Sequence, residues 1–425
     1  MTARQPSVVY CLTRFPKLSE TFVAREISAL RARGVDVEIR AFVREDTALV
    51  QPEASDLLNL AKYGSGGIVA AAVAQWHWLT RSTRKYLRLW STAIWACRRS
   101  PRFLVRSVAA IFVGAAWAHE MRVEPPDYVH AHFATHATTA AWAFGELLGV
   151  PFGFTAHAHD LFVDRSLLHE KSRAASLIVT ISEFNRRFMT ESVGIAADRI
   201  EIVRCGVDST VFASVPRPAN ATYSVVCVAT LEPKKGQSHL IEAARRLRDA
   251  GVEVRVTLIG DGPDRETLAE QIAAGSLESV VLLAGAADRT GVASALTAAD
   301  AFVLPSVVDE RGRMEGVPVA LMEAMAVGVP VVASSLSGIP ELVEHEVSGL
   351  LVPPGDAGAL ALAIRRLHDD RTLAAACSAG GRARIREEFD LGANADRLLA
   401  LVEGVVANSQ PADASAEVGN QESLR

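Results

Sequence analysis

Residues 305–341 read PSVVDERGRMEGVPVALMEAMAVGVPVVASSLSGIPE, and the rest of the chain is organised around this stretch. Two glutamates, Glu315 and Glu323, stand eight residues apart with Gly316 and Pro318 between them. Because proline is tolerated best in the first turn of a helix, we expect Glu315 in a loop and Glu323 in the second helical turn. The N-terminus of such a helix presents unpaired N–H groups and favours phosphate. An amphipathic helix with two solvated glutamates fits the same spacing.

The segment from Glu315 to Glu323, with the AMA and GVPVV runs that follow it, resembles the Glu-x7-Glu signature of the retaining family 4 glycosyltransferases. The resemblance implies an α/β architecture, the GT-B fold, in which two doubly wound parallel-sheet (Rossmann-like) domains face each other across a cleft. It also implies that Glu315 contacts the donor sugar and that Glu323 binds the ribose hydroxyls of the nucleotide. Gly316 and Val317 are expected to contact the donor beside them.

The alternation of strand and helix patterns also indicates two parallel-sheet domains. With 425 residues, 49% of them hydrophobic and 22% charged, the chain has the size and composition of a globular protein of two or three domains. We expect a first domain over residues 1–205 and a second over 220–381, joined by a proline-containing linker at 216–220. An amphipathic helix over 382–404 would return to the first domain, as in the family, and residues 407–425 are predicted to be disordered.

Short apolar runs between helical patterns predict the strands of both sheets. In the first domain they cover residues 8–12, 35–42, 128–133, 152–156, 177–181 and 200–204, and in the second they cover 224–229, 254–259, 280–284, 301–304 and 329–334. Ser182 follows one of these runs and is predicted to cap a helix.

The cysteines and the N-terminus indicate a cytoplasmic setting. The five cysteines are scattered and form no CxxC pair, which argues for a reducing compartment and against disulfides or structural zinc. The first six residues are polar and lead into a strand pattern, so we expect no signal peptide.

The net charge of −5 hides a difference between the two halves of the chain. Residues 1–205 carry 25 basic and 19 acidic side chains, a balance of +6, whereas residues 206–425 carry 19 and 30, a balance of −11. A basic first half suggests an anionic partner. Because no nucleic-acid-binding module is recognisable, we expect that partner to be a membrane surface and not a nucleic acid.

Basic side chains and tryptophans concentrate in residues 57–119. This segment holds nine Lys or Arg residues, no Asp or Glu, and five of the six tryptophans, Trp76, Trp78, Trp90, Trp95 and Trp117. Such a mixture is typical of helices in a membrane interface, although a helical insertion whose tryptophans pack on the domain would show it too. The longest apolar run, residues 108–118, is too short to span a bilayer. The segment therefore predicts peripheral association with the inner face of the plasma membrane.

Lys235 is the candidate for stabilising a leaving group. It lies where a predicted strand passes into a helix, and a fixed cation there can balance the charge that develops on a departing diphosphate. The family carries a lysine at this place in the motif Gly-Arg-Leu-x-x-x-Lys-Gly, and this chain reads ATLEPKKG at residues 229–236. Thr230 thus replaces the phosphate-binding arginine, and Lys234 is the residue available to compensate. Gly262, in the next turn, is also expected to contact the donor.

Two histidine pairs follow predicted strands, His130 with His132 and His157 with His159. Strand alternation places the members of each pair on one face, and such pairs can bind zinc. A zinc-dependent hydrolase is therefore an alternative enzyme class.

The segment FTAHAHD at residues 154–160 resembles the His-Gly-x-Asp segment of family 4 enzymes. The resemblance implies that His157 lines the donor sugar and that Asp160 helps to orient the acceptor. Ala158 departs from the usual glycine. His130 and His132 match the family's His-Ala-His-Phe strand end and would then have supporting roles.

The loop FPKLSETF at residues 15–22 resembles the N-terminal loop of family 4 enzymes that build bacterial exopolysaccharides of the colanic-acid type. In those enzymes the loop lies over the donor phosphates and the acceptor, which implicates Ser19. A simple helix cap would use the same residues.

These features predict a cytoplasmic, peripherally membrane-associated retaining hexosyltransferase. It would move a sugar from a nucleotide-diphosphate sugar to a lipid-linked or oligosaccharide acceptor in exopolysaccharide or other cell-surface polysaccharide biosynthesis, without a metal or other cofactor. Three alternatives stay open: an epimerase or phosphorylase on the same two-domain scaffold, the zinc hydrolase, and a non-catalytic nucleotide-sugar-binding partner that has lost the arginine at position 230.

Overall fold

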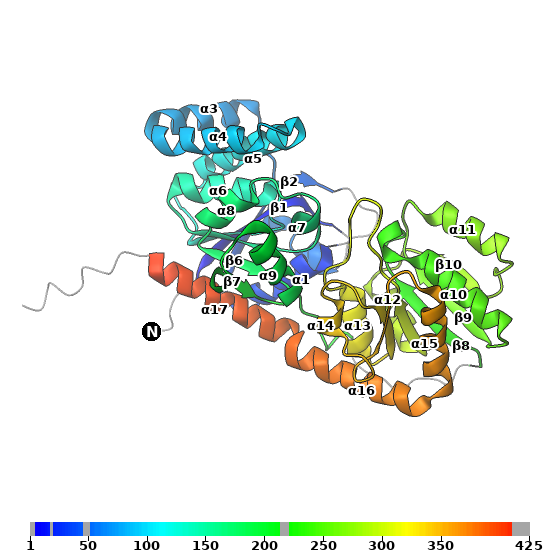
Figure 1. Ribbon diagram of the computed structural model, residues 1–425. Coiled ribbons are helices and arrows are strands. Elements are labelled where there is room, and N and C mark those ends of the chain that lie inside the picture. The colour runs from blue at the N-terminus through cyan, green and yellow to red at the C-terminus, as the bar shows by residue number, and fades with distance from the viewer. Residues whose placement is uncertain (1–4, 18–19, 46–51, 213–220, 410–425) are drawn as a thin grey trace, which may run out of the picture.

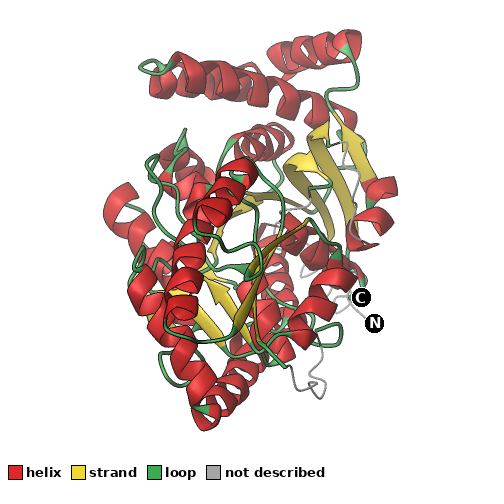
Figure 2. Ribbon diagram, turned by 90° about the vertical axis from the view of Figure 1, so that its right-hand side faces the viewer, coloured by secondary structure: helices red, strands yellow, loops and turns green. Residues whose placement is uncertain are grey.

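The computed structural model describes residues 5–17, 20–45, 52–212 and 221–409 of the chain. Ser19 and the predicted linker at 216–220 lie outside these residues. Two α/β units lie side by side, each with a parallel sheet between layers of helices (Figures 1 and 2). This arrangement confirms the predicted fold class.

The first sheet contains seven parallel strands in the order β3-β2-β1-β4-β5-β6-β7. They are β1 Ser7–Phe15, β2 Asp36–Arg44, β3 Ala61–Tyr63, β4 Tyr128–His132, β5 Phe152–Ala156, β6 Leu177–Thr180 and β7 Ile200–Ile202. Every strand predicted in this half is present. The prediction missed β3, because three residues at the edge of a sheet are too few to form a recognisable pattern.

The second sheet contains six parallel strands in the order β10-β9-β8-β11-β12-β13. They are β8 Tyr223–Val228, β9 Val254–Ile259, β10 Val281–Gly285, β11 Ala301–Leu304, β12 Val331–Ser334 and β13 Leu350–Val352. The short edge strand β13 is the one that the prediction missed.

Both sheets reverse their strand order once, between β1 and β4 and between β8 and β11. At such a point the connections leave toward opposite faces of the sheet, which opens a crevice at the carboxyl ends of the strands. The two crevices are the natural places for a ligand in this fold.

Helices cover both faces of each sheet (Figure 1). Those of the first unit are α1 Thr21–Arg31, α2 Pro52–Asp56, α3 Ile68–Arg81, α4 Thr83–Cys97, α5 Pro101–Glu120, α6 His136–Leu148, α7 His159–Phe162, α8 Leu168–Ala174 and α9 Glu183–Phe188. Those of the second are α10 Gln237–Asp249, α11 Arg265–Ala274, α12 Arg289–Ala298, α13 Val319–Val327, α14 Ile339–Leu342, α15 Ala357–Asp369 and α16 Arg371–Glu388. As predicted, Ser182 caps a helix, because its hydroxyl accepts a hydrogen bond from the N–H of Asn185 at the start of α9.

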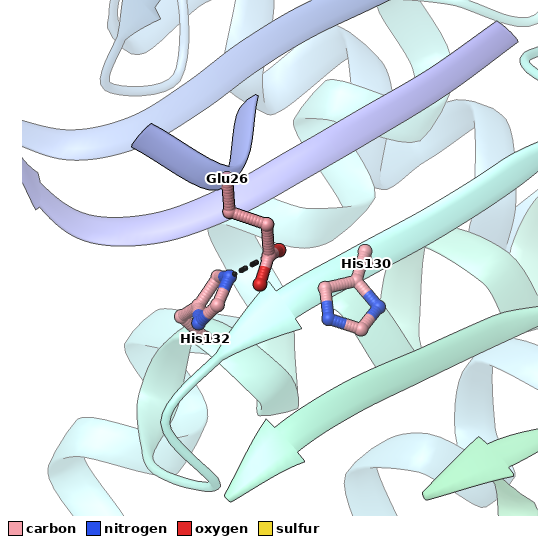
Figure 3. Close-up of side chains that lie close together, drawn as sticks. All are labelled: Glu26, His130 and His132. Carbon is pink, nitrogen blue, oxygen red and sulfur yellow. Dashed lines mark hydrogen bonds and ion pairs between the residues drawn. The ribbon is translucent and has the colours of Figure 1, made fainter. Parts of the chain in front are cut away.

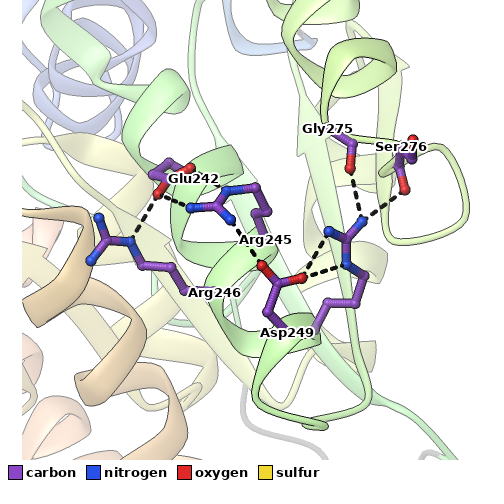
Figure 4. Close-up of polar contacts among 7 residues, drawn as sticks. Glu242, Arg245, Arg246, Asp249, Gly275 and Ser276 are labelled. Atoms are coloured by element: carbon purple, nitrogen blue, oxygen red, sulfur yellow. Dashed lines mark hydrogen bonds and ion pairs between the residues drawn. The ribbon is translucent and has the colours of Figure 1, made fainter.

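The outward face of α10 shows how charges are arranged where a helix faces solvent. Glu242 accepts hydrogen bonds from Arg245 and Arg246, and Asp249 accepts one from Arg245 (Figure 4). Exposed pairs one turn apart add little to stability, but they leave each cation beside a carboxylate.

The predicted helix over 382–404 is divided in two. α16 ends at Glu388, and α17, Leu391–Ser409, begins after Phe389 and Asp390. Asp390 caps α17, and Phe389 is buried in the core of the second unit. α17 then packs beside α1 on the core of the first unit, as the family resemblance implied, through Ala395, Leu398 and Val402. Residues 407–409 belong to α17 and not to a disordered tail, and the remainder of that tail lies outside the described residues.

The basic, Trp-rich segment contains β3 and a stack of three helices. α5 packs on α6, and α3 and α4 pack on α5 (Figure 1). Trp78 and Trp117 are buried and donate to backbone carbonyls, so the packing interpretation is correct for these two. Trp76 and Trp95 are 68% and 66% exposed. Among the described residues, α5 is the one helix long and apolar enough to cross a bilayer, but it lies inside this stack.

Gly114→Ala is expected to lower the melting temperature. A methyl group on Gly114 of α5 would overlap the carbonyl oxygen of Ala140 in α6 and lie 2.9 Å from its Cα. Because α5 packs closely on α6, relief requires the two helices to separate, and overpacking of this kind costs about 1–3 kcal/mol. The matched control is Gly404→Ala in α17, where nothing lies within 4 Å of the added methyl. The control should stabilise by about 0.4–1 kcal/mol. A Gly114→Ala variant that melts with the wild type would contradict the described contact between α5 and α6.

Candidate active site

A cleft of about 800 Å³ lies between the two units. Its first wall comes from the start of α1 and the turn after β5, and includes Thr21 and His157. Its second wall comes from the turns after β8 and β9 and from the loop before α13, and includes Lys235 and Glu315. The cleft thus lies where open parallel sheets bind ligands.

Glu315 is held between two lysines. It lies in the loop before α13, as predicted, and is 7% exposed. The Nζ atom of Lys235 is 2.9 Å from one of its oxygens, and Nζ of Lys234 is 3.2 Å from the other. Burial opposes ionisation of Glu315, but the two ammonium groups outweigh it and lower the pKa of the carboxyl to about 2. The cleft therefore presents two cations that are placed by one buried carboxylate.

Glu323 lies in the second turn of α13, also as predicted, and connects the two units. Arg25 of α1 donates a hydrogen bond from Nη1 to its Oε1 atom over 2.8 Å, and both side chains are buried. The Arg25 guanidinium also lies 3.4 Å from Glu53. Burial raises the pKa of Glu323, although the charge of Arg25 opposes this. A ligand that binds Glu323 must therefore share the carboxylate with Arg25.

Three of the other predicted donor contacts line the cleft, and Gly262 does not. Thr230, Gly316 and Val317 line the cleft. Gly262 is not among the lining residues, and a methyl group there would lie 2.8 Å from the backbone nitrogen of Leu231, so this glycine permits close packing of two turns. Ser19 lies outside the described residues.

His157 lines the first wall, and Asp160 holds it there. The carboxylate of Asp160 accepts hydrogen bonds from the N–H groups of His157 and Ala134, at distances down to 2.7 Å. Asp160 is fully buried and is not among the residues that line the cleft, so its contact with an acceptor stays a prediction. Its pKa is raised to about 6 by burial. The physical role of Asp160 is to shape the turn that places His157.

A chain of hydrogen bonds runs behind His157. Its Nε2 atom lies 3.1 Å from Nδ1 of His132, and Nε2 of His132 lies 3.0 Å from Oε1 of Glu26 (Figure 3). Tyr10 donates to the same glutamate oxygen. Because an ionised carboxylate only accepts, His132 carries a proton on Nε2. Burial opposes ionisation of Glu26, but His132 outweighs it and lowers the pKa of the carboxyl.

The hydrogen bond to His132 sets the tautomer of His157. Burial, together with His132 and His130, lowers the pKa of His157 well below its ordinary value, so His157 is neutral. With the proton of His132 on Nε2, Nδ1 of His132 accepts a hydrogen bond from Nε2 of His157. His157 then keeps a lone pair on Nδ1.

Glu26, His130 and His132 lie close enough to hold a metal ion, with one ligand atom from each within 4.8 Å of the others (Figure 3). His130, however, already contacts Thr155 at 2.9 Å and Tyr128 at 3.4 Å through its two ring nitrogens. Burial, with His132, lowers its pKa to about 3. All three side chains have protein partners, so the geometry favours a hydrogen-bonded support for His157 over a metal centre.

Comparison with known proteins establishes the family. Residues 19–211 match the family described as Glycosyltransferase Family 4, and residues 213–384 match Glycosyl transferases group 1. A protein of Escherichia coli (strain K12) named a colanic acid biosynthesis glycosyltransferase, WcaL, is 36% identical over 376 residues, which cover 83% of this chain and 88% of that protein. The chain belongs to glycosyltransferase family 4. An amylovoran biosynthesis glycosyltransferase of Erwinia amylovora, AmsK, is 42% identical to this family 4 chain over 200 residues, which cover 47% of this chain and 49% of AmsK.

Solved structures share the fold of this glycosyltransferase. Anabaena HepE in complex with UDP matches with a TM-score of 0.70 and 18% identity, covering 94% of this chain and 100% of HepE. A sucrose-phosphate synthase of Thermosynechococcus elongatus matches with a TM-score of 0.73 and 19% identity, covering 95% and 100%. The predicted GT-B fold is confirmed, and membership of a transferase family argues against the zinc hydrolase.

Sequence reasoning missed Arg25 and Glu26, both in α1. Glu26 falls beside the apolar stripe of Val23, Ile27 and Leu30, and a carboxylate at the edge of a buried stripe requires a partner. That position was the signal available in the sequence. Arg25 gave none, because its partner Glu323 comes from the other unit.

Glu26→Gln is expected to lower kcat about tenfold while KM for the sugar donor and the melting temperature stay near those of the wild type. The neutral amide weakens a charge-assisted hydrogen bond to His132 by about 1.5 kcal/mol, which is roughly tenfold in rate if the bond matters in the transition state. Steady-state kinetics with a nucleotide sugar that the protein turns over would measure this. Glu38→Gln serves as the control, since Glu38 pairs with Arg40 and Lys62 away from the cleft. Equal kcat values for both variants would remove Glu26 from the active site.

Proposed function

We propose that this glycosyltransferase moves a hexose from a nucleoside-diphosphate sugar to a saccharide acceptor in the biosynthesis of an exopolysaccharide or another cell-surface polysaccharide. The observation that carries the proposal is the pair of lysines that contact Glu315 in a cleft shared by both units. The names of the relatives, colanic acid and amylovoran biosynthesis glycosyltransferases, support the pathway. HepE structures that contain UDP and UDP-glucose support a nucleotide-sugar donor.

In the proposed complex Lys235 stabilises the negative charge that develops on the leaving diphosphate. Lys234 supplies the second positive charge, in place of the family arginine for which this chain has Thr230. Its Nζ atom contacts the same carboxylate as that of Lys235, which supports this assignment. Glu323 accepts hydrogen bonds from the ribose hydroxyls.

We infer that transfer proceeds with retention. The bond between the anomeric carbon and the phosphate oxygen breaks, the bond to the acceptor oxygen forms on the same face, and the acceptor proton passes to the departing phosphate. Glu315 is poorly suited to attack the sugar, because ammonium groups contact both of its oxygens. It therefore positions the donor sugar, beside His157. Proton NMR of the product anomer tests the stereochemistry.

The two lysines also make a metal unnecessary in this proposal, so a chelator should not change turnover. The acceptor is proposed to be lipid-linked, and the protein to work in the cytoplasm at the inner face of the plasma membrane as a peripheral protein. These assignments rest on the family resemblance and on the basic first half of the chain.

A non-catalytic nucleotide-sugar-binding role is the second candidate, because Thr230 removes one phosphate-binding cation. Epimerase or phosphorylase activity on the same scaffold is distinguished by the product. The test is a panel of nucleotide sugars, each measured for its effect on the melting temperature of the protein. A ligand at 100 times its Kd should raise the free energy of unfolding by about 2.7 kcal/mol. Binding without turnover on any saccharide acceptor would favour the non-catalytic role.

Lys235→Ala is expected to lower kcat by about two orders of magnitude or more, with a smaller change in donor KM, because the lost stabilisation belongs to the transition state. Lys234→Ala should have an intermediate effect. Lys62→Ala, which removes an exposed lysine on the outer edge of the first sheet, is the control. Wild-type turnover in Lys235→Ala would exclude this lysine from the mechanism.

Glu323→Gln is expected to weaken UDP binding at neutral pH by roughly 10- to 100-fold, since hydrogen bonds to a charged acceptor are worth about 1.5–3 kcal/mol. In the wild type, acidification protonates Glu323 and should weaken UDP binding. Because burial raises its pKa, this loss should begin above the ordinary glutamate value of about 4.3. Isothermal titration calorimetry at several pH values measures both effects. A Kd that is unchanged in the variant would refute ribose binding by Glu323.

A further inference from the structure

Exposed apolar side chains gather on the outermost layer of the helical stack. Among the described residues seventeen large apolar side chains are exposed, and nine of them lie between positions 68 and 105. They are Ile68, Val69, Val73, Trp76, Leu79, Leu87, Ile94, Trp95 and Val105. All but Val105 belong to α3 and α4, the helices farthest from the first sheet (Figure 1). We call the outward side of α3 and α4, together with Arg98 and Arg99 in the turn after α4, the outer face.

α3 is apolar on both of its sides. Ala71, Ala74 and Trp78 are buried against the stack. The opposite side carries Ile68, which is 89% exposed, and Val69, which is 78% exposed, together with Val73, Trp76 and Leu79. A helix that is apolar all round is normally covered on all sides, and the only charged residue in α3 is Arg81 at its end. Something other than water is therefore expected to cover this side.

α4 places cations among apolar side chains on the same face. Its buried side is formed by Tyr86, Leu89, Ala93 and Cys97. Its exposed side carries Arg84, Leu87, Arg88, Ile94 and Trp95, and the exposed Arg98 and Arg99 follow its last residue, Cys97. The guanidinium of Arg98 lies over the ring of Trp95, 4.3 Å from its centroid.

Several of these cations have no acidic partner. Arg88 pairs with Glu146, but no ion pair within the described residues involves Arg81, Arg84, Arg98 or Arg99, all of which are exposed. The outward face of α10 is the opposite case, since there each arginine contacts a carboxylate (Figure 4). The surface of α10 is what we expect of a helix that faces water. The outer face, with unpaired cations among exposed apolar side chains, is not.

We propose that the outer face docks onto an anionic lipid bilayer. Exposed tryptophan and aliphatic side chains enter the boundary between headgroups and acyl chains, and the unpaired arginines contact anionic headgroups. α3 and α4 would then lie in the plane of the membrane without crossing it.

Charge argues against a second copy of the chain as the occupant. Most homodimers are twofold symmetric, so that a surface patch meets itself. Contact through the outer face would bring arginines against arginines, and residues 57–119 contain no carboxylate that could separate them. An anionic bilayer supplies the missing charge.

The proposal does not depend on the transferase activity. No residue of the outer face lines the cleft, and the nearest sheet lies beneath α5 and α6. Docking and nucleotide binding can therefore be measured separately on the full-length protein.

The test is co-sedimentation of the full chain with phosphatidylcholine vesicles, with and without phosphatidylglycerol. The wild type should bind only the anionic vesicles, and high salt should weaken this binding. A cation variant, Arg81→Gln with Arg84→Gln, Arg98→Gln and Arg99→Gln, should bind roughly 100- to 1,000-fold more weakly, because each cation near an anionic surface contributes about a fivefold factor. An apolar variant, Val69→Ser with Val73→Ser and Trp76→Ser, should also bind more weakly and should lose part of the blue shift of tryptophan fluorescence.

Matched controls change equal numbers of exposed arginines and exposed large apolar residues elsewhere in the chain. The charge control replaces Arg173, Arg187, Arg255 and Arg386 by glutamine, four exposed arginines for which the described structure shows no ion pair. The apolar control replaces Val123, Leu282 and Leu362 by serine, which are 79%, 55% and 69% exposed. Both controls should bind vesicles as the wild type does, and all variants should keep the wild-type thermal shift with UDP.

Three results would overturn the proposal. The wild type could stay in the supernatant with anionic vesicles at low salt. The charge control could lose as much binding as the cation variant, which would assign binding to overall charge. Light scattering could show a dimer that the apolar variant dissociates, which would make a second copy the occupant.

Discussion

Burying the carboxylate of Glu315 is tolerable only because Lys234 and Lys235 contact its two oxygens. The contact joins the loop before α13 to the turn after β8. The loop and the turn follow neighbouring strands, β11 and β8, and together they form one wall of the cleft. The contact places two adjacent ammonium groups in the cleft, close to the turn where this chain has Thr230 in place of the family arginine. In the proposed complex these two lysines supply the positive charge beside the diphosphate.

The two units are held in register by ion pairs across the cleft and by the C-terminal helix. Arg25 reaches Glu323 at the base of the cleft, and Glu341 accepts hydrogen bonds from the first N–H groups of α9 and from Arg204. α17 crosses to the first unit and packs beside α1 (Figure 1). The same helix, α1, thus has two roles. Its Arg25 contacts Glu323 of the second unit, and its Glu26 supports His157 through His132.

The first unit is built in layers, with a close-packed core on the inside and an uncovered apolar layer on the outside. Its sheet, α5 and α6 form a close-packed core in which Trp117 and Phe144 are fully buried. Moving outward through α5 to α3, the helices remain apolar, but the last layer has nothing packed on it in the described structure. The composition of residues 57–119 therefore has two causes, since Trp78 and Trp117 serve the interior whereas Trp76 and Trp95 face outward.

The sequence by itself determined most of the succession of strands and helices along the chain, because this depends on local periodicity. Motif spacing placed Glu315 before a helix and Glu323 within it, and indicated the family. The sequence did not determine which of five tryptophans are buried, that the last helix breaks at Asp390, or that Asp160 supports a turn and does not face the cleft. Tertiary structure alone decided that Arg25 meets Glu323, 298 residues away, and that Glu26 meets His132, 106 residues away. Such pairs leave no periodic pattern, since their energy comes from burial of charge where separate elements converge.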